Sequence, residues 1–365
     1  MYSYDNRIVL TLDAGGTNFV FSAIQANKEI VTPYCLPACS DHFEKCLDTL
    51  VKGFTHKKKQ LLSEPVAISF AFPGPADYKN GIIGDLPNFP SFRGGVPLGP
   101  FLEEYFQIPV FINNDGNLFA YGEALAGALP DLNKRLKEHG SKREYKNLTG
   151  ITFGTGFGSG IVIDNHLLTG DNDCGGDIWV LRNKLHPNMI AEESVSIRAI
   201  TRVYDELSHI EDKALTPKDI FLIAEGDKDG DRQAAIDSFA QFGEAAGDAI
   251  AHLLTFTDGI VVTGGGIMGA AKYIMPALLK EMKSTLTTFA GNTLSRLQME
   301  IFDMADEKQF EYFLLDKSVE LQIPGSNKTA HYNPNKKTVI MKTALGTSRA
   351  ISLGAYAYAL HKIDN

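Results

Sequence analysis

Apolar residues in this chain fall into short runs that end at glycine-rich turns. Residues 7–32 give an apolar strand, the turn "DAGGTN" and a second apolar strand. The same design of strand, small-residue turn and strand returns near residue 148, in "LTGITFGTGFGSGIVI". Two copies of one design indicate two related lobes.

The segments between and after these copies predict both strands and helices. Buried strands are expected in "PVAISFAFPGP" and "IPVFINND", and helices at 41–62 and in "PLGPFLEEYFQ". Beyond about residue 190 the apolar spacing becomes helical. One more strand and glycine turn, "GIVVTGGGI", and a closing helix rich in Ala and Gly follow. This mixture predicts an α/β fold.

Two polar segments interrupt the pattern. Residues 130–147 form the most hydrophilic stretch, which we interpret as a surface excursion without a role in chemistry. Residues 110–127, "VFINNDGNLFAYGEALAG", indicate a strand, a polar elbow and a small-residue helix. Because Asp-Gly is a common turn signal, two roles stay open for Asp115: a turn former, or a carboxylate held over a substrate.

Composition narrows the class of protein. A chain of 365 residues with 44% hydrophobic content can bury a large core, and its length favours two domains. The formal charge of -9 leaves no basic surface for a nucleic-acid backbone, so no nucleic-acid partner is expected. The N-terminus lacks the features of a signal peptide, and no segment approaches the ~20 apolar residues of a membrane span. We therefore expect a cytoplasmic protein without a membrane partner.

Four soft metal ligands lie within a dozen residues: Cys35, Cys39, His42 and Cys46. The sequence around them favours an amphipathic helix instead, capped near Ser40 or Asp41, with Cys46 on its apolar face. We interpret Cys46 as a small buried hydrophobic residue, although metal binding stays open.

The glycine turns need a joint explanation, since each alone could serve only a β hairpin. Glycine lets backbone amides approach an anion closely, and the hydroxyls of Thr17 and Thr155 add donors. No GxxxxGK[ST] sequence occurs, which excludes the Walker-type phosphate loop. Gly264, Gly266 and Gly269 satisfy G-x-G-x-x-G, but the acidic strand end that a dinucleotide site needs about 20 residues later is missing. A dehydrogenase is therefore a poor alternative.

Taken in order, five motifs resemble the ROK family of bacterial sugar kinases, within the actin, Hsp70 and hexokinase-like superfamily: "LTLDAGGTN", "FAFPGPAD", "LPNFPSFRGGVPLGPFLEEYFQIPVFINNDGN", "GITFGTGFGSGIVI" and "VVTGGGI". The resemblance implies a two-lobed, actin-like ATPase (ribonuclease H-like) fold, with ATP and sugar meeting in a cleft between the lobes. We expect a small α/β lobe at residues 1–112 and 347–365, and a large α/β lobe with helical insertions at 113–346.

The resemblance also implies a nucleotide site with ATP and Mg2+ as cofactors. Asp13 would orient the magnesium ion through water. The implied contacts to the nucleotide are Gly15, Gly16, Thr17, Gly154, Thr155, Gly156, Gly264, Gly265 and Gly266. The first three belong to the γ-phosphate, the next three to a second phosphate loop, and the last three to the adenosine.

Phosphoryl transfer needs positioning, charge neutralisation and one base for the attacking hydroxyl. The family's base falls on Asp115, in "NND". The sugar contacts that the resemblance implies are Gly74, Asn88, Asn114, Asp115, Asp177 and Glu192.

The sugar side departs from the family's pattern. Zinc-bearing members carry "GEIGH" and then "CxCGxxGCxE", whereas "GDIWV" here puts Asp177 and Val180 at the Glu and His positions. If Glu192 aligns with the final Glu, the three cysteine positions become Asn183, Leu185 and Ile190. No structural zinc is therefore expected.

Three further residues stay open on the sugar side. Glu193 could replace Glu192 if the alignment slips, His186 could reach inward or be an ordinary loop residue, and Trp179 could stack on a sugar or cap the core.

We interpret the chain as an ATP-dependent, Mg-assisted ROK kinase that phosphorylates the 6-hydroxyl of a hexose, with glucose first. Fructose, mannose, allose or an N-acetylhexosamine are alternative substrates. A sugar-sensing ROK repressor and a structural or chaperone ATPase are alternative classes. Family members are commonly dimers or tetramers, so a homodimer or homotetramer is expected.

Overall fold

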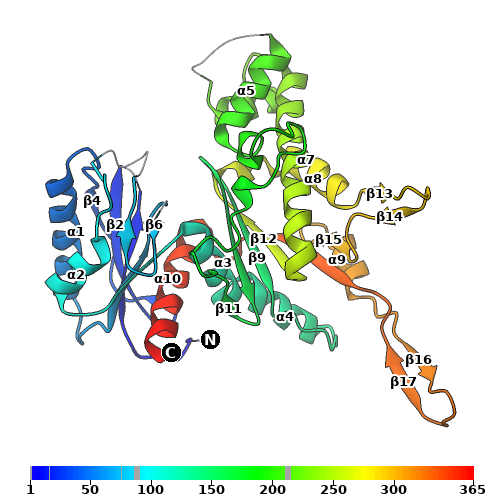
Figure 1. Ribbon diagram of the computed structural model, residues 1–365, viewed down its shortest axis with the longest axis horizontal. Helices are drawn as coiled ribbons and strands as arrows, with labels where there is room; N and C mark the ends of the chain where they lie inside the picture. The colour runs from blue at the N-terminus through cyan, green and yellow to red at the C-terminus, as the bar shows by residue number, and fades with distance from the viewer. Residues whose placement is uncertain (1, 16, 75, 86–90, 210–214) are drawn as a thin grey trace. The chain divides into compact units, whose positions relative to one another are not determined.

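The computed structural model describes residues 2–15, 17–74, 76–85, 91–209 and 215–365. The chain divides into two compact units. In Figure 1 the colour follows the residue number along the chain. Unit 1 comprises Met1–Pro130, Gly160–Gly176 and Thr343–Asn365, and unit 2 comprises Asp131–Ser159 and Asp177–Lys342. Residues 113–130, 160–176 and 343–346, which the sequence prediction gives to the large lobe, belong to unit 1.

Unit 1 is built around a sheet with the strand order β3-β2-β1-β5-β8, and β4 also pairs with β2. The pair β1–β2 is antiparallel, whereas β1–β5 and β5–β8 are parallel. The strands of unit 1, with the small β6–β7 hairpin and β11, are β1 (Val9–Ala14), β2 (Asn18–Gln25), β3 (Lys28–Glu29), β4 (Tyr34–Pro37), β5 (Ala67–Ala71), β6 (Ala76–Asp77), β7 (Ile82–Ile83), β8 (Val110–Asn113) and β11 (His166–Leu167).

Helices cover both faces of this sheet because side chains alternate along its strands. Leu10 and Leu12 of β1 pack into a core with α1 (Phe43–Lys58) and α2 (Leu98–Phe106). Val9, on the opposite face, packs with α10 (Thr347–Asp364), and α3 (Asp115–Ala126) packs on α10.

The α3–α10 contact is backbone against backbone. A Cβ atom added at Gly122 of α3 would overlap the carbonyl oxygen of Ala350, and one added at Gly354 of α10 would overlap that of Leu118. This close approach explains why both helices are rich in small residues, and why residues 113–130 cluster with the C-terminal helix.

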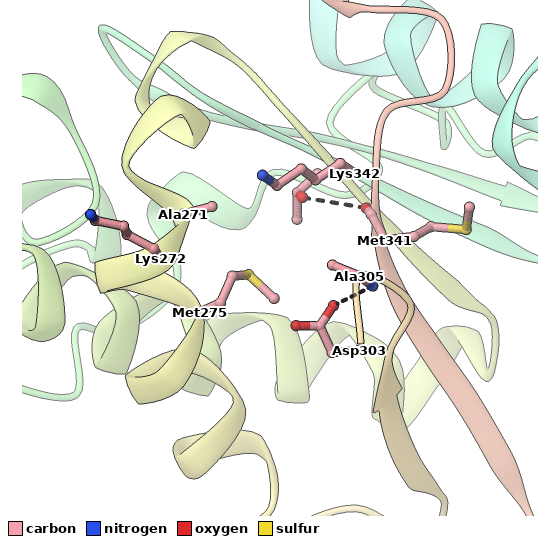
Figure 2. A pocket seen from close by; sticks show the side chains of 8 residues that line it. Ala271, Lys272, Met275, Asp303, Ala305, Met341 and Lys342 are labelled. Atoms are coloured by element: carbon pink, nitrogen blue, oxygen red, sulfur yellow. Dashed lines mark hydrogen bonds between the residues drawn. The ribbon is translucent and has the colours of Figure 1, made fainter. Parts of the chain in front are cut away.

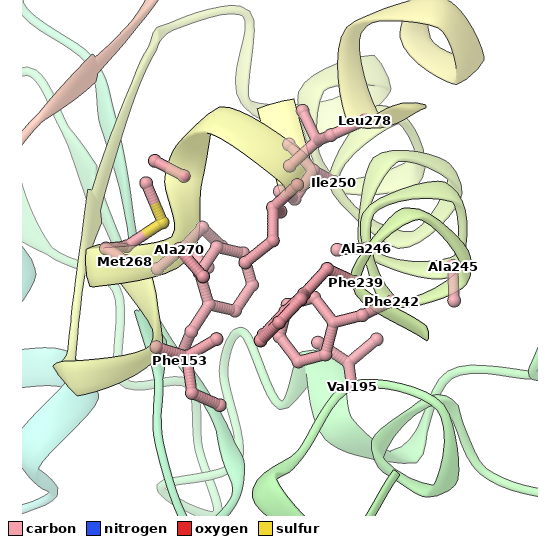
Figure 3. Packing of buried hydrophobic residues seen from close by; sticks show 14 of the residues in the cluster. Phe153, Val195, Phe239, Phe242, Ala245, Ala246, Ile250, Met268, Ala270 and Leu278 are labelled. Carbon is pink, nitrogen blue, oxygen red and sulfur yellow. The ribbon is translucent and has the colours of Figure 1, made fainter. Parts of the chain in front are cut away.

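Unit 2 contains a parallel sheet with the strand order β9-β12-β18-β15. Its strands are β9 (Leu148–Phe153), β12 (Ile260–Gly264), β18 (Lys337–Lys342) and β15 (Glu300–Asp303), and its helices include α5 (Ile197–Ser208), α6 (Pro217–Glu225), α7 (Arg232–Thr257) and α8 (Ala271–Met282). Figure 3 shows Phe153 of β9, Phe242 of α7 and Leu278 of α8 in one buried cluster. The chain passes between the units within α4 (Ala128–Glu138) and β10 (Phe157–Ile163).

Residues 283–336 add two hairpins, which the sequence patterns did not predict. β13 (Thr285–Thr287) pairs with β14 (Thr293–Ser295), and β16 (Val319–Gln322) pairs with β17 (Thr329–Tyr332). The helix α9 (Glu307–Leu314) precedes the second hairpin.

The main elements predicted from the sequence are confirmed, including both strand-turn-strand copies and the helices after residue 190. The predicted cap of α1 is wrong: the helix begins at Phe43 after His42, which makes no side-chain capping bond. Cys46 is buried on its apolar face, as predicted. Among the described residues, no helix is long and apolar enough to cross a membrane.

The interpretation of residues 130–147 as a surface excursion is also wrong in part. Their first half belongs to α4, on which Leu129, Leu132 and Leu136 are buried. The leucines have helical spacing, but charged residues lie between them. The composition of the segment therefore suggested a surface loop and hid the spacing.

Candidate active site

The polar elbow after β8 is built by three asparagines. Asn114 is the N-cap of α3, and its Oδ1 accepts hydrogen bonds from the amides of Gly116 at 2.7 Å and Asn117 at 3.4 Å. The Oδ1 of buried Asn113 accepts from the amide of Asn114 at 2.7 Å and from Nδ2 of Asn117 at 3.0 Å. The asparagine side chains thus supply the cap of α3 and hold the turn that precedes it.

Asp115 is the first residue of α3 and keeps an exposed surface, although protein surrounds most of its carboxyl group. Desolvation raises the pKa of this carboxyl group, and the nearby carboxylate of Asp13, in β1, raises it further. The amide of Gly116 donates to Oδ1 at 2.8 Å and opposes the shift. Unit 1 therefore brings together two of the predicted site residues, Asp13 and Asp115.

The first glycine turn follows β1 directly. The amide of Gly15 donates to the carbonyl of Asn18 at 3.1 Å, and the carbonyl of Thr17 accepts from the amide of Ala38 at 2.9 Å. Gly74 lies in the loop after β5, where an added Cβ would come within 3.0 Å of the Tyr78 hydroxyl. The two remaining predicted contacts in this part of the chain, Gly16 and Asn88, lie outside the described residues.

The second glycine turn joins β9 to β10 in unit 2. The amide of Gly154 donates to the carbonyl of Gly156 at 3.1 Å, and the amide of Phe157 donates to Oε2 of Glu192 at 3.0 Å. A Cβ at Gly156 would lie 2.6 Å from the same carboxylate oxygen, so only glycine leaves room for Glu192 here. The predicted second phosphate turn and the predicted sugar carboxylate are therefore neighbours.

Arg198, which the sequence patterns did not single out, fixes this carboxylate from the other side. Its Nη2 lies 3.2 Å from Oε1 of Glu192 and 3.4 Å from Oε1 of Glu193. The side chain of Glu193 is 43% exposed against 22% for Glu192, and it is the carboxylate of Glu192 that accepts from the turn. The geometry favours Glu192 over Glu193 as the residue at the turn.

The loop before Glu192 is organised by Asn183, at the first of the family's cysteine positions. Its buried side chain accepts from the amides of Leu185 at 2.9 Å and His186 at 3.1 Å, and donates to the carbonyl of Ile190 at 3.1 Å and to Oγ of Ser194 at 2.8 Å. Four hydrogen bonds from one amide thus hold the loop that ends at Glu192. Residue type alone could not reveal this role, because Asn is common in loops.

Asp177 and Trp179 lie beside each other at the short helix η1 (Ile178–Val180) of unit 2. Desolvation raises the pKa of the Asp177 carboxyl group, and a hydrogen bond from Trp179 opposes the rise. Trp179 is 40% exposed and Val180 52% exposed, so neither belongs to the core. The segment "GDIWV", which departs from the family's pattern, is therefore accessible at Trp179 and Val180.

A pocket of about 200 Å³ lies next to the third glycine turn (Figure 2). Thr263, directly before Gly264, lines it together with Met275, Asp303 and Lys342. In Figure 2, Met275 and Asp303 point into this space, whereas Lys272 points away, toward Glu225. Since sites for drug-sized ligands usually span roughly 300–1,000 Å³, this volume suits a single ring system.

The third turn itself has a restricted backbone. Gly265 has φ of 93°, and Gly266 opens the short helix η3 (Gly266–Ala270). A Cβ at Gly265 would overlap the carbonyl of Phe153 in β9. The turn therefore packs against the end of β9, directly before Gly154.

Metal ligands do not gather at the cysteines. In the described part of the chain, no group of three or more His, Cys, Asp or Glu side chains could hold a metal ion. Cys35 is exposed, whereas Cys46 is buried and burial raises its pKa to about 12. The alternative of a cysteine metal site has no support.

The model of the ROK family matches residues 9–305. The chain belongs to the ROK family. A crystal structure of a glucokinase from Parabacteroides distasonis is 58% identical, with a TM-score of 0.88 and coverage of 99% of both chains. A glucokinase from Halalkalibacterium halodurans is 28% identical over 319 residues, which are 78% of this chain and 87% of that protein.

An N-acetyl-D-glucosamine kinase from Vibrio cholerae is 29% identical over 170 residues, 47% of this chain and 51% of that protein. The match thus spans about half the length of that ROK relative. The family and the α/β fold predicted from the sequence are confirmed, and the relatives' names agree with the predicted class of enzyme, a sugar kinase.

Proposed function

We propose that this chain transfers the γ-phosphoryl group of ATP to the 6-hydroxyl of a hexose, with glucose as the preferred sugar and Asp115 as general base. The observation that carries the proposal is the Asp115 carboxylate, which protein largely surrounds and which lies near Asp13, in a chain 58% identical to a glucokinase.

Asp115 suits the part of a base for three reasons. Its carboxylate lies at the N-terminal end of α3, on a rigid element whose cap is supplied by Asn114. Desolvation raises its pKa toward the working pH, which improves its ability to accept a proton from the sugar hydroxyl. The side chain of Asn114 uses Oδ1 for the cap, which leaves Nδ2 to donate to a sugar oxygen.

The nucleotide side follows from the glycine turns and the pocket. The amides of the turns at Gly15 and Gly154 would bind phosphate oxygens, and the pocket beside Thr263 would hold the adenine ring. Mg2+ is bound through one or two carboxylates and keeps several waters, a requirement that Asp13 fits. The ion would neutralise charge that develops on the phosphates.

In unit 2 the sugar contacts would be Glu192 and Asp177, and Gly74 of unit 1 stays a predicted contact. Glu192 has one carboxylate oxygen held by the Phe157 amide and the other by Arg198, so its position is fixed before a sugar binds. The accessible Asp177–Trp179 pair is where an N-acetyl group could be admitted or refused, which keeps N-acetylglucosamine as the second candidate substrate.

A panel of hexoses and N-acetylhexosamines with ATP and Mg2+, followed by ADP release, tests the proposal. We expect release with glucose, little without sugar, and a loss of roughly 10²–10⁴ in kcat for Asp115→Asn. Asp171→Asn, an exposed aspartate of the same unit, is the matched control and should keep full activity.

Inactivity on every sugar would overturn the kinase and favour a sugar-sensing regulator. Near-normal turnover of Asp115→Asn would overturn the assignment of the base alone. A cytoplasmic location stays a prediction of the sequence.

A further inference from the structure

The pocket beside the third glycine turn contains a carboxylate, that of Asp303, to which the proposed function gives no role. All residues that line this pocket belong to unit 2, and they lie at the carboxyl ends of three parallel strands. Thr263 of β12 is in register with Lys342 of β18, and β15, on the other side of β18, ends at Asp303. Since open parallel sheets bind ligands outside the carboxyl ends of their strands, this place in the fold suits a small molecule.

The side chain of Asp303 is held in one orientation. Its Oδ1 accepts a hydrogen bond from the amide of Ala305 at 2.9 Å, and its backbone amide donates to Oε1 of Gln309 at 3.0 Å. Figure 2 shows the bond to Ala305 as a dashed line and the second carboxylate oxygen on the side of Met275. One oxygen of the carboxylate is therefore engaged, and the other, Oδ2, faces the pocket.

Oδ2 of Asp303 is available to a ligand. In the described part of the chain, no protein group donates a hydrogen bond to this oxygen, and no Lys or Arg forms an ion pair with the carboxylate. Lys272, which also lines the pocket, pairs with Glu225 instead. Because hydrogen bonds to an ionised acceptor are roughly twice as strong as neutral ones, Oδ2 would select a ligand with a donor at this position.

Apolar side chains supply the surface for a flat ring. Met275 of α8 points into the space, and Ala271 lies one turn before it on the same helix (Figure 2). A thioether makes favourable contacts with an aromatic ring. A pocket of about 200 Å³ with an apolar side and one free acceptor thus fits an aromatic ring that carries an amino group.

We propose that Asp303 determines the specificity for the base of the phosphoryl donor, and that its Oδ2 accepts a hydrogen bond from the 6-amino group of adenine. The inference rests on the proposed function, which puts the base of ATP in this pocket. Hypoxanthine and guanine carry a carbonyl oxygen at the same ring position, and a carboxylate oxygen repels it. Guanine could instead offer its N1–H and 2-amino donors side by side, but this pair needs two free acceptors, and Oδ1 is engaged with Ala305.

Binding of Mg-ADP and Mg-IDP to the full chain without sugar tests the inference, with isothermal titration calorimetry as the measurement. In IDP a carbonyl group replaces the 6-amino group of ADP. We expect ADP to bind roughly 10–100-fold more tightly, the usual effect of a hydrogen bond to a charged group. In sugar phosphorylation the same factor should separate the KM values of ATP and ITP, while kcat changes little.

Asp303→Asn should reverse this preference. The amide of Ala305 still needs an acceptor, so Oδ1 of the asparagine stays with it and Nδ2 takes the place of the carboxylate's Oδ2. A donor then faces the 6-position of the base, and we expect the variant to bind IDP at least as tightly as ADP. Glu307→Gln, at an exposed position four residues later, removes the same charge outside the pocket and should keep the wild-type preference. Circular dichroism shows whether each variant is folded.

Three results would overturn the inference: a wild type that binds ADP and IDP equally, a wild type that binds neither, and a folded Asp303→Asn variant that keeps the wild-type ratio. The comparison of the two nucleotides on the wild type decides the matter even if the variant does not fold. Tight binding of ADP over IDP without phosphorylation of any sugar would support the role of Asp303 and overturn only the kinase. Phosphorylation of a sugar with equal KM values for ATP and ITP would do the reverse.

Discussion

At the scale of single residues, the desolvated carboxyl group of Asp115 carries a cost in stability. Because desolvation raises its pKa above the ordinary 3.8, the folded state holds a proton that the unfolded chain has already released between these two values. The folded state then loses stability as pH rises through this window, and the loss is complete above the raised pKa. We predict that Asp115→Asn, which has no charge to desolvate, melts at a higher temperature than the wild type at neutral pH.

The pH dependence of this gain separates it from a packing effect. The difference in melting temperature should be small near or below pH 3.8, where both states carry the proton, and should grow as pH rises. Differential scanning calorimetry of both proteins from acid to neutral pH provides the measurement. A gain that is constant with pH, or a variant less stable than the wild type at neutral pH, would contradict a desolvated carboxylate at this position.

The buried side chain of Asn183 holds the loop before Glu192 through four hydrogen bonds. Its amide holds Leu185, His186, Ile190 and Ser194, and Ala in its place would leave several buried polar groups without partners. Each such group costs about 1–3 kcal/mol, so we predict that Asn183→Ala lowers the melting temperature. Since the loop leads to Glu192, the KM for the sugar should rise about tenfold or more while the KM for ATP changes little.

Asn188, which is exposed in the same loop, supplies the control. Asn188→Ala should leave both KM values and the melting temperature unchanged. If Asn183→Ala lowers stability but leaves the KM for the sugar unaltered, Asn183 is structural only and does not position Glu192.

At the scale of secondary-structure elements, the crossing of α3 and α10 reverses the usual effect of helix propensity. Ala is favoured over Gly in a helix interior by about 1 kcal/mol. At Gly354, however, a Cβ would overlap the Leu118 carbonyl of α3. We predict that Gly354→Ala destabilises the protein by several kcal/mol, because backbone must move, a cost at the upper end of overpacking effects.

Chemical denaturation measures this change, with Ser348→Ala as the control, at an exposed position of the same helix. The control should lie within about 0.5 kcal/mol of the wild type. A Gly354→Ala variant as stable as the wild type would mean that the two helices can separate without cost.

The elements that local patterns specify were predictable, and those that depend on tertiary contacts were not. The turns after β1 and β9 follow from glycine between apolar runs, and α7 follows from helical spacing over 26 residues. The start of α1 did not follow, because its N-terminus has no side-chain cap to announce it. The strands β16 and β17 alternate apolar and polar residues for only four residues each, too short a run to be distinguished from a loop.

At the scale of the whole molecule, the order of the motifs predicted the family, while individual contacts of the site had to come from the structure. Asp115 was identifiable because "NND" matches the family's motif, but the stretch alone could not tell a turn former from a base. In the structure Oδ1 of Asn114 caps α3, which supports the proposal that Asp115 is a base and more than a turn former. Arg198 gave no signal at all, since its partner Glu192 is separated from it by an irregular segment.

Stability of the whole chain should report sugar binding without turnover. A ligand that binds only the folded state raises the free energy of unfolding by about 2.7 kcal/mol at one hundred times its Kd. We predict that D-glucose raises the melting temperature of the wild type, and also of Asp115→Asn, since binding precedes proton transfer. Thermal scans with increasing D-glucose check this, and L-glucose, which has the same composition but mirror-image hydroxyls, should have no effect. Another sugar, such as N-acetylglucosamine, could raise the melting temperature more than glucose at equal concentration. That sugar would then replace glucose as the preferred substrate, because it binds the folded chain more tightly.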